Sequence, residues 1–391
     1  MTHTTLRNAT LQDLAATLKE QADARFDVVA HSGNLSFRGG NLIIQGADAV
    51  ITEEGVTSVE TNLRPTDIFD EGVSSRLDIP RKYLRRMRDL GKAALAGEQP
   101  DSAIADLLDH NVNVWLSESD KQWFIRGFKS DGASEGIARA FLSDRFNTID
   151  NYDVLLSVLS GVKEAGLEVD ITTCDLSERR MRVRINAPEI QALAPTLLRN
   201  YRSPFTGQSG AENPVVFAGI DIGNSETGGG AFTITPVITA LVCKNGMTIT
   251  KEALRKVHLG SKMDEGVIRW SEQTKQANVD LVKAQTADAV RTFLDVDYIS
   301  AKIAEMEAKA TCEVGEPTKV IEKVSRQFSF TEEESEGILG HFIKGGDVSA
   351  GGVLHAITSF AQVVADPDRA QDIEATALDA LDFACSLTAQ G

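Results

Sequence analysis

FAGIDIGNSETGGGAFTITPVITALVCKNGM, residues Phe217–Met247, is the stretch that decides the fold. Runs rich in β-branched residues, Val215–Ile222 and Ala231–Val242, lie on either side of a polar, glycine-rich segment. β-branched residues favour strands, whereas glycine allows tight turns and close backbone approach that bulky side chains prevent. The pattern therefore predicts two strands joined by a hairpin-like connection. The polar side chains expected to project from this connection are Asn224, Ser225 and Glu226.

A second strand pair precedes the first. Glu168–Asp175 and Arg180–Asn186 have the composition of two strands joined by a short turn. Side chains alternate between the two faces of a strand, so Arg180, Arg182 and Arg184 are expected to share one face. Arginine is seldom buried without a partner. This face is therefore expected either to be solvated or to meet an anion.

Helices are expected on both sides of this central region. The spacing of apolar residues predicts a helix over Leu11–Ala24 and mainly helical structure over Ser271–Asp295 and Tyr298–Gly391. Further strands are predicted at Phe26–Ala30, Leu42–Gln45 and Gly55–Glu60, and a hairpin at Val112–Leu116 and Gln122–Phe128. The sequence thus predicts an α+β fold with a central antiparallel sheet and packed helices, a mixed N-terminal lobe and a helical C-terminal region. The expected domains are 1–131, 132–264 and 265–391.

The composition of the 391 residues is that of a soluble globular protein. No apolar run approaches the roughly 18 residues of a membrane-spanning helix, and the N-terminus lacks the basic start and apolar block of an export signal. Four cysteines lie far apart without a CxxC pair, which argues against a zinc site or a disulfide scaffold. We therefore expect a cytoplasmic protein without a membrane partner.

Charge is unevenly distributed along the chain. The formal net charge of −17 disfavours a protein that coats nucleic acid with its whole surface. The C-terminal stretch Thr331–Gly391 carries eleven acidic and two basic residues, about half of the net charge. Glu71–Lys92, by contrast, has a net charge of +4. Local basic surface is therefore available in a chain that is acidic overall.

The basic stretch contains the sequence IPRKYLRRMRDL, residues Ile79–Leu90, which has the spacing of an amphipathic helix. Its apolar residues share one face and leave the arginines on the other. Such a face is either solvated or directed at phosphate.

Five motifs follow one another along the chain: LDIPRKYLRRM, IARAFLSDRFNTIDNYDVLL, IGNSETGGGAFTITPVITALVCKNGM, KVHLG and GGVLHAITSFAQ. With these motifs in this order, the chain resembles a widespread phage and plasmid protein family, filed as a domain of unknown function, from about Asp78 to about Leu381. Asp78 stands where the family pattern usually carries glycine. The resemblance implies a phage or plasmid context and no particular reaction.

The expected order of elements is also similar in topology to single-strand annealing proteins of phage recombination. Such proteins hold the DNA backbone in a basic groove and assemble into rings or filaments. This similarity implies a nucleic-acid-binding protein that binds or anneals single-stranded DNA in recombination or replication, forms homo-oligomers and acts in the host cytoplasm. We expect a binding protein rather than an enzyme, with no cofactor and no metal. The expected nucleic-acid-binding residues are Arg180, Arg182, Arg184, Arg199, Arg202, Asn224, Ser225 and Glu226.

Two other functions are compatible with the sequence. A metal-dependent phosphoesterase could assemble oxygen ligands and one imidazole from Asp221, Glu226, His258 and Asp264. Alternatively, the acidic Thr331–Gly391 stretch could contact a host or phage protein. GNSETGGG lacks the Gly-Lys-Ser/Thr end of a phosphate-binding loop, so nucleotide triphosphate hydrolysis is not expected.

Overall fold

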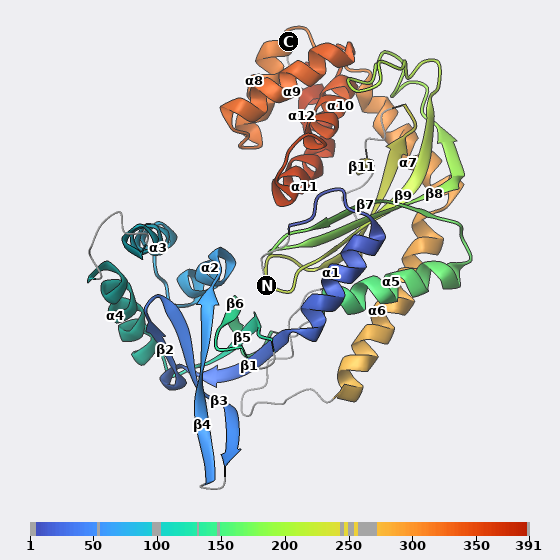
Figure 1. Cartoon of the computed structure of the whole chain (residues 1–391). Helices are drawn as coiled ribbons and strands as arrows, with labels where there is room; N and C mark the ends of the chain where they lie inside the picture. The colour runs from blue at the N-terminus through green and yellow to red at the C-terminus, as the bar shows by residue number, and fades with distance from the viewer. Residues whose placement is uncertain are drawn as a thin grey trace.

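The computed structural model describes residues 5–52, 55–95, 103–130, 133–146, 149–242, 246–248, 254–256 and 272–388. Two β-sheets form the framework, and each has its own buried apolar core. The first sheet belongs to an N-terminal lobe, blue and cyan in Figure 1. The second sheet and the remaining helices form a larger body beside it (Figure 1). The predicted α+β class is confirmed.

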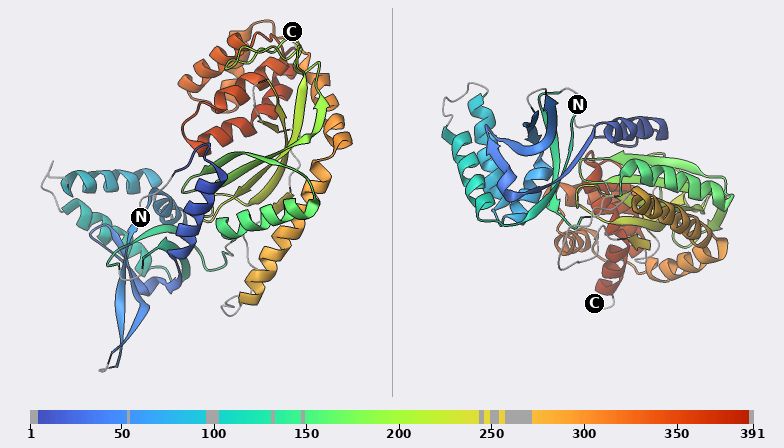
Figure 2. Two further views of the ribbon diagram at one scale, coloured as in Figure 1. Left: turned by 45° about the vertical axis from the view of Figure 1, so that its right-hand side comes forward. Right: turned by 90° about the horizontal axis from the view of Figure 1, so that it is seen from below.

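The N-terminal lobe combines a mixed sheet with three helices. Its elements are β1 (Arg25–His31), η1 (Ser32–Asn34), β2 (Leu35–Arg38), β3 (Asn41–Thr52), β4 (Gly55–Pro65), α2 (Asp67–Arg76), α3 (Arg81–Leu95), α4 (Ala103–Ser117), β5 (Gln122–Phe128) and β6 (Gly136–Ser143). The strand order is β1-β5-β6-β4-β3-β2, and β4 runs parallel to β6. Phe69 of α2, Leu84 of α3 and Leu108 of α4 anchor these helices in the lobe's core. Figure 2 shows β3 and β4 extending beyond the rest of the sheet as a two-stranded ribbon.

The larger body is built on an antiparallel sheet. Before and within this sheet lie α1 (Leu11–Asp23), α5 (Asn151–Ala165), β7 (Asp170–Leu176), β8 (Met181–Leu193), β9 (Val215–Asn224), β10 (Phe232–Ala240), β11 (Gly246–Thr248) and β12 (Leu254–Lys256). The strand order is β11-β10-β9-β8-β7, with β12 also paired to β10. The two predicted strand pairs are thus present and adjacent, because β8 pairs with β9.

Helices complete the body on both sides of this sheet. They are α6 (Glu272–Phe293), α7 (Val296–Ala310), α8 (Pro317–Gln327), α9 (Glu332–Gly345), α10 (Ala350–Ala361), α11 (Pro367–Ala375) and α12 (Ala377–Thr388). In Figure 1, α5, α6 and α7 lie along one side of the sheet, and the C-terminal helices lie on the other. This arrangement explains why β9 is buried along nearly its whole length, and not only on alternate residues. None of the described helices is long and apolar enough to cross a membrane.

Two local expectations differ from the structure. Val112–Leu116 belongs to the helix α4, not to a strand, so the hairpin predicted there is wrong. The buried residues Leu108, Val112 and Leu116 recur every four positions, which is a helical spacing. The β-branched residues Val112 and Val114 favoured the interpretation as a strand. In addition, β6 lies after residue 131 and yet pairs with β4 and β5 of the first sheet. The change from one sheet to the other therefore comes after Ser143.

The cysteines are also placed differently from what their spacing indicates. Cys312, just after α7, and Cys385, on α12, form a disulfide across 73 residues. α12 packs against α7 and α8, and this packing brings the two cysteines together. Cys174 on β7 is free and buried. Sequence separation carries no information about such a pairing, because the pairing depends on how the helices pack.

Candidate nucleic-acid interface

The arginine row of β8 lies against acidic side chains of the protein itself. Arg182 and Arg184 share one face of the strand, as predicted, but each is only 6% exposed. α11 covers this face, and its residue Glu374 accepts hydrogen bonds from both arginines. Asp221, on the neighbouring strand β9, pairs in register with Arg184 and also binds both arginines. The anion that this face meets is therefore the carboxylate pair of Asp221 and Glu374.

Short distances and burial make this four-residue network tight. Arg182 Nη1 donates to Glu374 Oε2 at 3.0 Å, and Arg184 Nε donates to Asp221 Oδ1 at 2.7 Å. Burial alone would raise the pKa of Asp221, but the two guanidinium groups outweigh burial and lower that pKa to about 2. For Arg182 the signs are reversed. Burial by itself would lower the pKa of the guanidinium, but the carboxylates of Asp221 and Glu374 outweigh burial and raise that pKa. Neither arginine can bind a phosphate unless this network breaks.

The Asn224–Glu226 connection is enclosed between the two sheets. Glu226 Oε2 accepts from Arg139 Nη1 at 3.0 Å, and its Oε1 accepts from the backbone N–H of Asn151 at 2.6 Å. Asn224 donates to the carbonyl of Ile149 at 2.9 Å. All three residues of the connection are buried, so the expectation that they project is wrong. The polar residues form a joint between lobes, because Arg139 lies on β6 of the first sheet.

Sequence reasoning missed two arginines in this joint. Arg126 on β5 and Arg139 on β6 are almost fully buried. Arg126 Nε donates to Asp27 at 2.9 Å, and its Nη2 lies 2.7 Å from Asp150. Each arginine is the single charged residue in a mostly apolar strand, QWFIRGF or GIARAFLS. That pattern is the signal that could have identified them, since a buried charge requires a partner.

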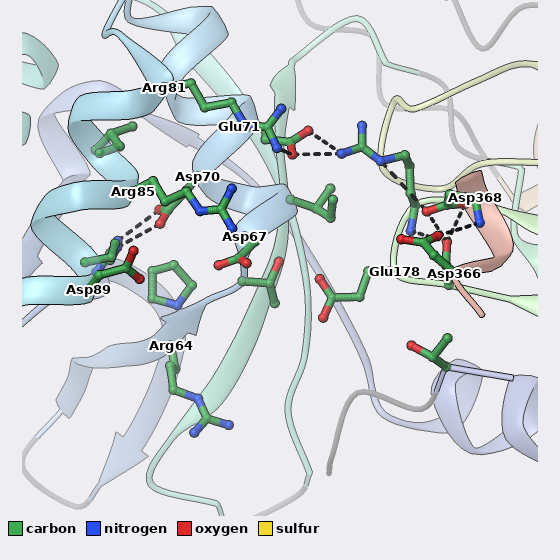
Figure 3. A pocket seen from close by; sticks show the side chains of 18 of the residues that line it. Arg64, Asp67, Asp70, Glu71, Arg81, Arg85, Asp89, Glu178, Asp366 and Asp368 are labelled. Atoms are coloured by element: carbon green, nitrogen blue, oxygen red, sulfur yellow. Dashed lines mark hydrogen bonds and ion pairs between the residues drawn. The ribbon is translucent and has the colours of Figure 1, made fainter. Parts of the chain in front are cut away.

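A cleft of about 1210 Å³ separates α2 and α3 from the β7–β8 turn and the start of α11. Figure 3 shows Arg81 and Glu71 on one wall, facing Glu178, Asp366 and Asp368 across the opening. Arg179 of the turn spans the gap, and its Nη2 lies 2.6 Å from Glu71. The lining holds seven arginines and eight carboxylates. Ion pairs occupy most of these arginines, so the cleft as a whole has no excess positive charge.

Exposed cations without an ion pair in the described chain gather on α3, and one of them, Arg85, also lines the cleft. Lys82, Arg85 and Arg86 are exposed and have no carboxylate within 4.0 Å in the described part of the chain. Their spacing puts them on one stripe of the helix, where they line a shallow hollow of about 400 Å³. Arg64, at the end of β4, adds a fourth such cation at the cleft wall. Leu84 and Met87 anchor the opposite face in the core.

The other predicted contact residues have mixed surroundings. Arg180 Nη1 pairs with Asp372 of α11 at 2.6 Å, so it too faces an acidic side chain. Arg199 and Arg202, in the loop after β8, are exposed and have no carboxylate partner among the residues that the structure describes. The five arginines predicted to bind nucleic acid thus fall into two groups. Three of them pair with acidic residues beneath α11, and the other two, Arg199 and Arg202, are exposed to solvent.

The predicted metal ligands do not come together in the part of the chain described. Asp221 and Glu226 are engaged by arginines in two separate networks. His258 and Asp264 lie outside the described residues. Within the described ranges, no group of three or more histidine, cysteine or acidic side chains could hold a metal ion.

Comparisons with known proteins add no relative. No family model matches the chain, and neither the curated proteins nor the solved structures searched yield a match. The resemblance to the phage and plasmid family therefore stays a prediction that rests on the motifs alone.

Proposed function

We propose that this protein binds nucleic acid, single-stranded DNA in the first instance, through the exposed cationic stripe of α3. The observation that carries the proposal is that Lys82, Arg85 and Arg86 are exposed, adjacent and without a carboxylate partner among the described residues. Among the contact residues predicted from the sequence, by contrast, Arg180, Arg182 and Arg184 already form ion pairs with carboxylates of the protein. We therefore propose that α3, and not β8, binds the phosphates.

The physical case rests on charge that the fold leaves uncompensated. Binding of a phosphate by a lysine or arginine releases counterions from the nucleic acid, which supplies most of the sequence-independent affinity. An exposed cation without a partner loses no ion pair when it binds phosphate, whereas a paired arginine must give one up. Asp89 is the acidic residue beside the stripe, and it too lines the hollow. The stripe keeps a net positive charge even so.

The test is binding of labelled single-stranded and duplex DNA to the full chain, measured by fluorescence anisotropy across a salt series. Replacing Arg85 and Arg86 with alanine should weaken binding and make the salt slope for a single strand shallower, by about 0.7 for each phosphate that the variant no longer neutralises. The matched control replaces Lys323 and Arg326, two exposed cations on α8, with alanine. Equal binding by the α3 variant and the control would remove α3 from the proposal, and no binding by the native protein at low salt would end it.

The remaining context is proposed on the motif resemblance. We infer a phage or plasmid origin and action in the cytoplasm of the host cell, either as a homo-oligomer or with a host or phage protein as partner. Light scattering of the purified protein, with and without DNA, tests the oligomer. A single monomer mass under both conditions would contradict it.

A further inference from the structure

An exposed aromatic ring stands on the loop that follows β8. Phe205 is 46% exposed, and among the aromatic residues whose burial the structure describes it alone is classed as exposed. Its ring makes a T-shaped contact with the ring of His341 on α9, with the centroids 5.7 Å apart. Because nearly half of the residue is still exposed, part of the ring is open to a ligand.

Hydrogen bonds hold this ring on a rigid turn. Ser203 N–H donates to the carbonyl of Gln208 at 3.0 Å, and Gly207 N–H donates back to the carbonyl of Ser203 at 2.9 Å. Gly207 has φ +70, a conformation that favours glycine. The side chain of Thr206 reaches the carbonyl of Val242 at 3.1 Å, which fixes the turn to the end of the sheet. Phe205 is therefore presented at little further cost in conformational entropy.

Basic side chains lie near the turn that carries the ring, and Arg202 Nη1 donates to the carbonyl of Gly207 in that turn at 2.9 Å. Arg199 and Arg202 come from the same loop, and the backbone N–H of Arg202 donates to Gly345 at the end of α9. That contact places Lys344 beside them. Segments 199–212 and 340–347 hold three basic residues, Arg199, Arg202 and Lys344, against two acidic ones, the exposed Glu212 and the buried Asp347. The patch of Arg199, Arg202, Phe205 and Lys344 thus lies in a region of net charge +1, in a chain of net charge −17.

We propose that this patch, which we call the Phe205 patch, is a second contact for single-stranded nucleic acid. The arginines and the lysine bind phosphates, and an unpaired base stacks on the open face of the Phe205 ring. The inference rests on the proposed function and deepens it, because it accounts for a preference between strands. In a duplex the faces of the bases are already stacked on one another, so only a single strand can use the ring.

The Phe205 patch lies apart from α3. Figure 1 shows the loop after β8 beside the C-terminal helices, whereas α3 lies at the far side of the N-terminal lobe. Substitutions in the two places can therefore be read independently. A variant of Phe205 should change the ratio of single-strand to duplex affinity, whereas a variant of α3 should weaken both.

The experiment compares the native chain with Phe205→Leu and Phe205→Trp, using labelled oligothymidylate and a labelled duplex of equal length. Phe205→Leu keeps an apolar side chain and removes the ring, so it should weaken single-strand binding by about fivefold or more, the order measured for one stacked base, and leave duplex binding unchanged. Phe205→Trp should restore single-strand binding. Leu193→Ala, which alters another exposed apolar residue, is the control and should change neither affinity.

The outcomes separate this inference from the proposed function. If Arg85 and Arg86 variants weaken binding but Phe205→Leu does not, the Phe205 patch is overturned and the α3 interface stands. If the native chain binds neither probe, both proposals fail. A change in molecular mass by light scattering in Phe205→Leu, with DNA binding intact, would overturn the inference by identifying a protein-docking surface.

Discussion

The arginines of β8 and those of α3 differ in what the fold places against them. Both regions have several basic residues within a few positions of sequence, and both were expected on a single face. On β8, Arg182 and Arg184 are buried beneath α11 and share two carboxylates. On α3, Arg85 and Arg86 are exposed and form no ion pair with a carboxylate within 4.0 Å in the described chain, although Asp89 lines the same hollow. On β8, positive charge therefore forms buried ion pairs that hold α11 against the sheet. On α3, positive charge is exposed to solvent.

The difference teaches that a periodic pattern identifies a face but not what covers it. Alternation along β8 correctly put Arg182 and Arg184 together. The helix that covers them contributes Glu374 from 190 residues away, and nothing near β8 in the sequence points to it. On α3 the helical spacing of Leu84 and Met87 is enough, because it orients the whole helix with the cationic stripe outward.

The largest expected effect is on stability, from breaking the buried network of β8. Glu374→Gln keeps the shape of the side chain and removes one of the two carboxylates that neutralise Arg182 and Arg184. Removing one partner from a buried ionic network leaves an uncompensated charge and should lower the free energy of unfolding by about 3–5 kcal/mol. Urea denaturation followed by circular dichroism measures this loss.

A double variant sharpens the same comparison. Arg184→Met together with Glu374→Gln leaves Arg182 paired with Asp221, so the two losses should be less than additive. The control is Arg326→Met on α8, where the exposed cation should contribute less than about 0.5 kcal/mol. If Glu374→Gln lowered the free energy of unfolding by less than about 1 kcal/mol, the ion pairs between α11 and β8 would not stabilise the fold, since breaking a buried network should cost several times more.

A smaller effect is expected from pH, because Asp221 lies in the network with its pKa lowered to about 2. An aspartate with a lowered folded-state pKa stabilises the fold above its unfolded pKa of about 4, and this stabilisation is lost as pH falls toward the folded pKa. The loss should be on the order of 2 kcal/mol between about pH 6 and about pH 2. Glu226, whose pKa is also lowered despite its burial, changes stability in the same direction.

Unfolding by urea at a series of pH values between these limits measures the effect. Asp221→Asn should have a shallower dependence on pH than the native chain, whatever its stability at neutral pH. Asp372→Asn, which alters a more exposed carboxylate of α11, should keep the native slope. A native slope in Asp221→Asn would place the acid sensitivity elsewhere.

The elements that sequence could predict are those governed by neighbours in the chain. The pairs β7–β8 and β9–β10 and the helix α1 follow from β-branched strand composition, glycine turns and the spacing of apolar residues. The connection at Asn224, Ser225 and Glu226 is recognisable as a polar turn, but its burial is not. That burial depends on Arg139 of the other sheet, which no local pattern connects to it.

The candidate interface shows the same limit. The sequence predicts Arg199 and Arg202 as contact residues without information on their exposure, whereas Phe205, three residues after Arg202, gives no signal, because a single phenylalanine is usually part of a core. Only the folded structure shows that Phe205 is exposed and packs against His341 of α9. The disulfide between Cys312 and Cys385 likewise follows from helix packing and has no signature in the sequence.

The smallest expected effect on stability comes from α3 and completes the comparison. Arg85→Ala and Arg86→Ala each remove an exposed cation with no carboxylate partner in the described chain, so each should change the free energy of unfolding by less than about 0.5 kcal/mol. The same variants should weaken DNA binding, which separates affinity from stability. Arg88→Ala on the same helix is the internal control, because Arg88 bonds Asp70 at 2.8 Å and lies against Phe37. It should lower stability more than either exposed arginine. If Arg85→Ala destabilised the fold as much as Arg88→Ala, the exposed arginines would also be structural, and the contrast between α3 and β8 would no longer hold.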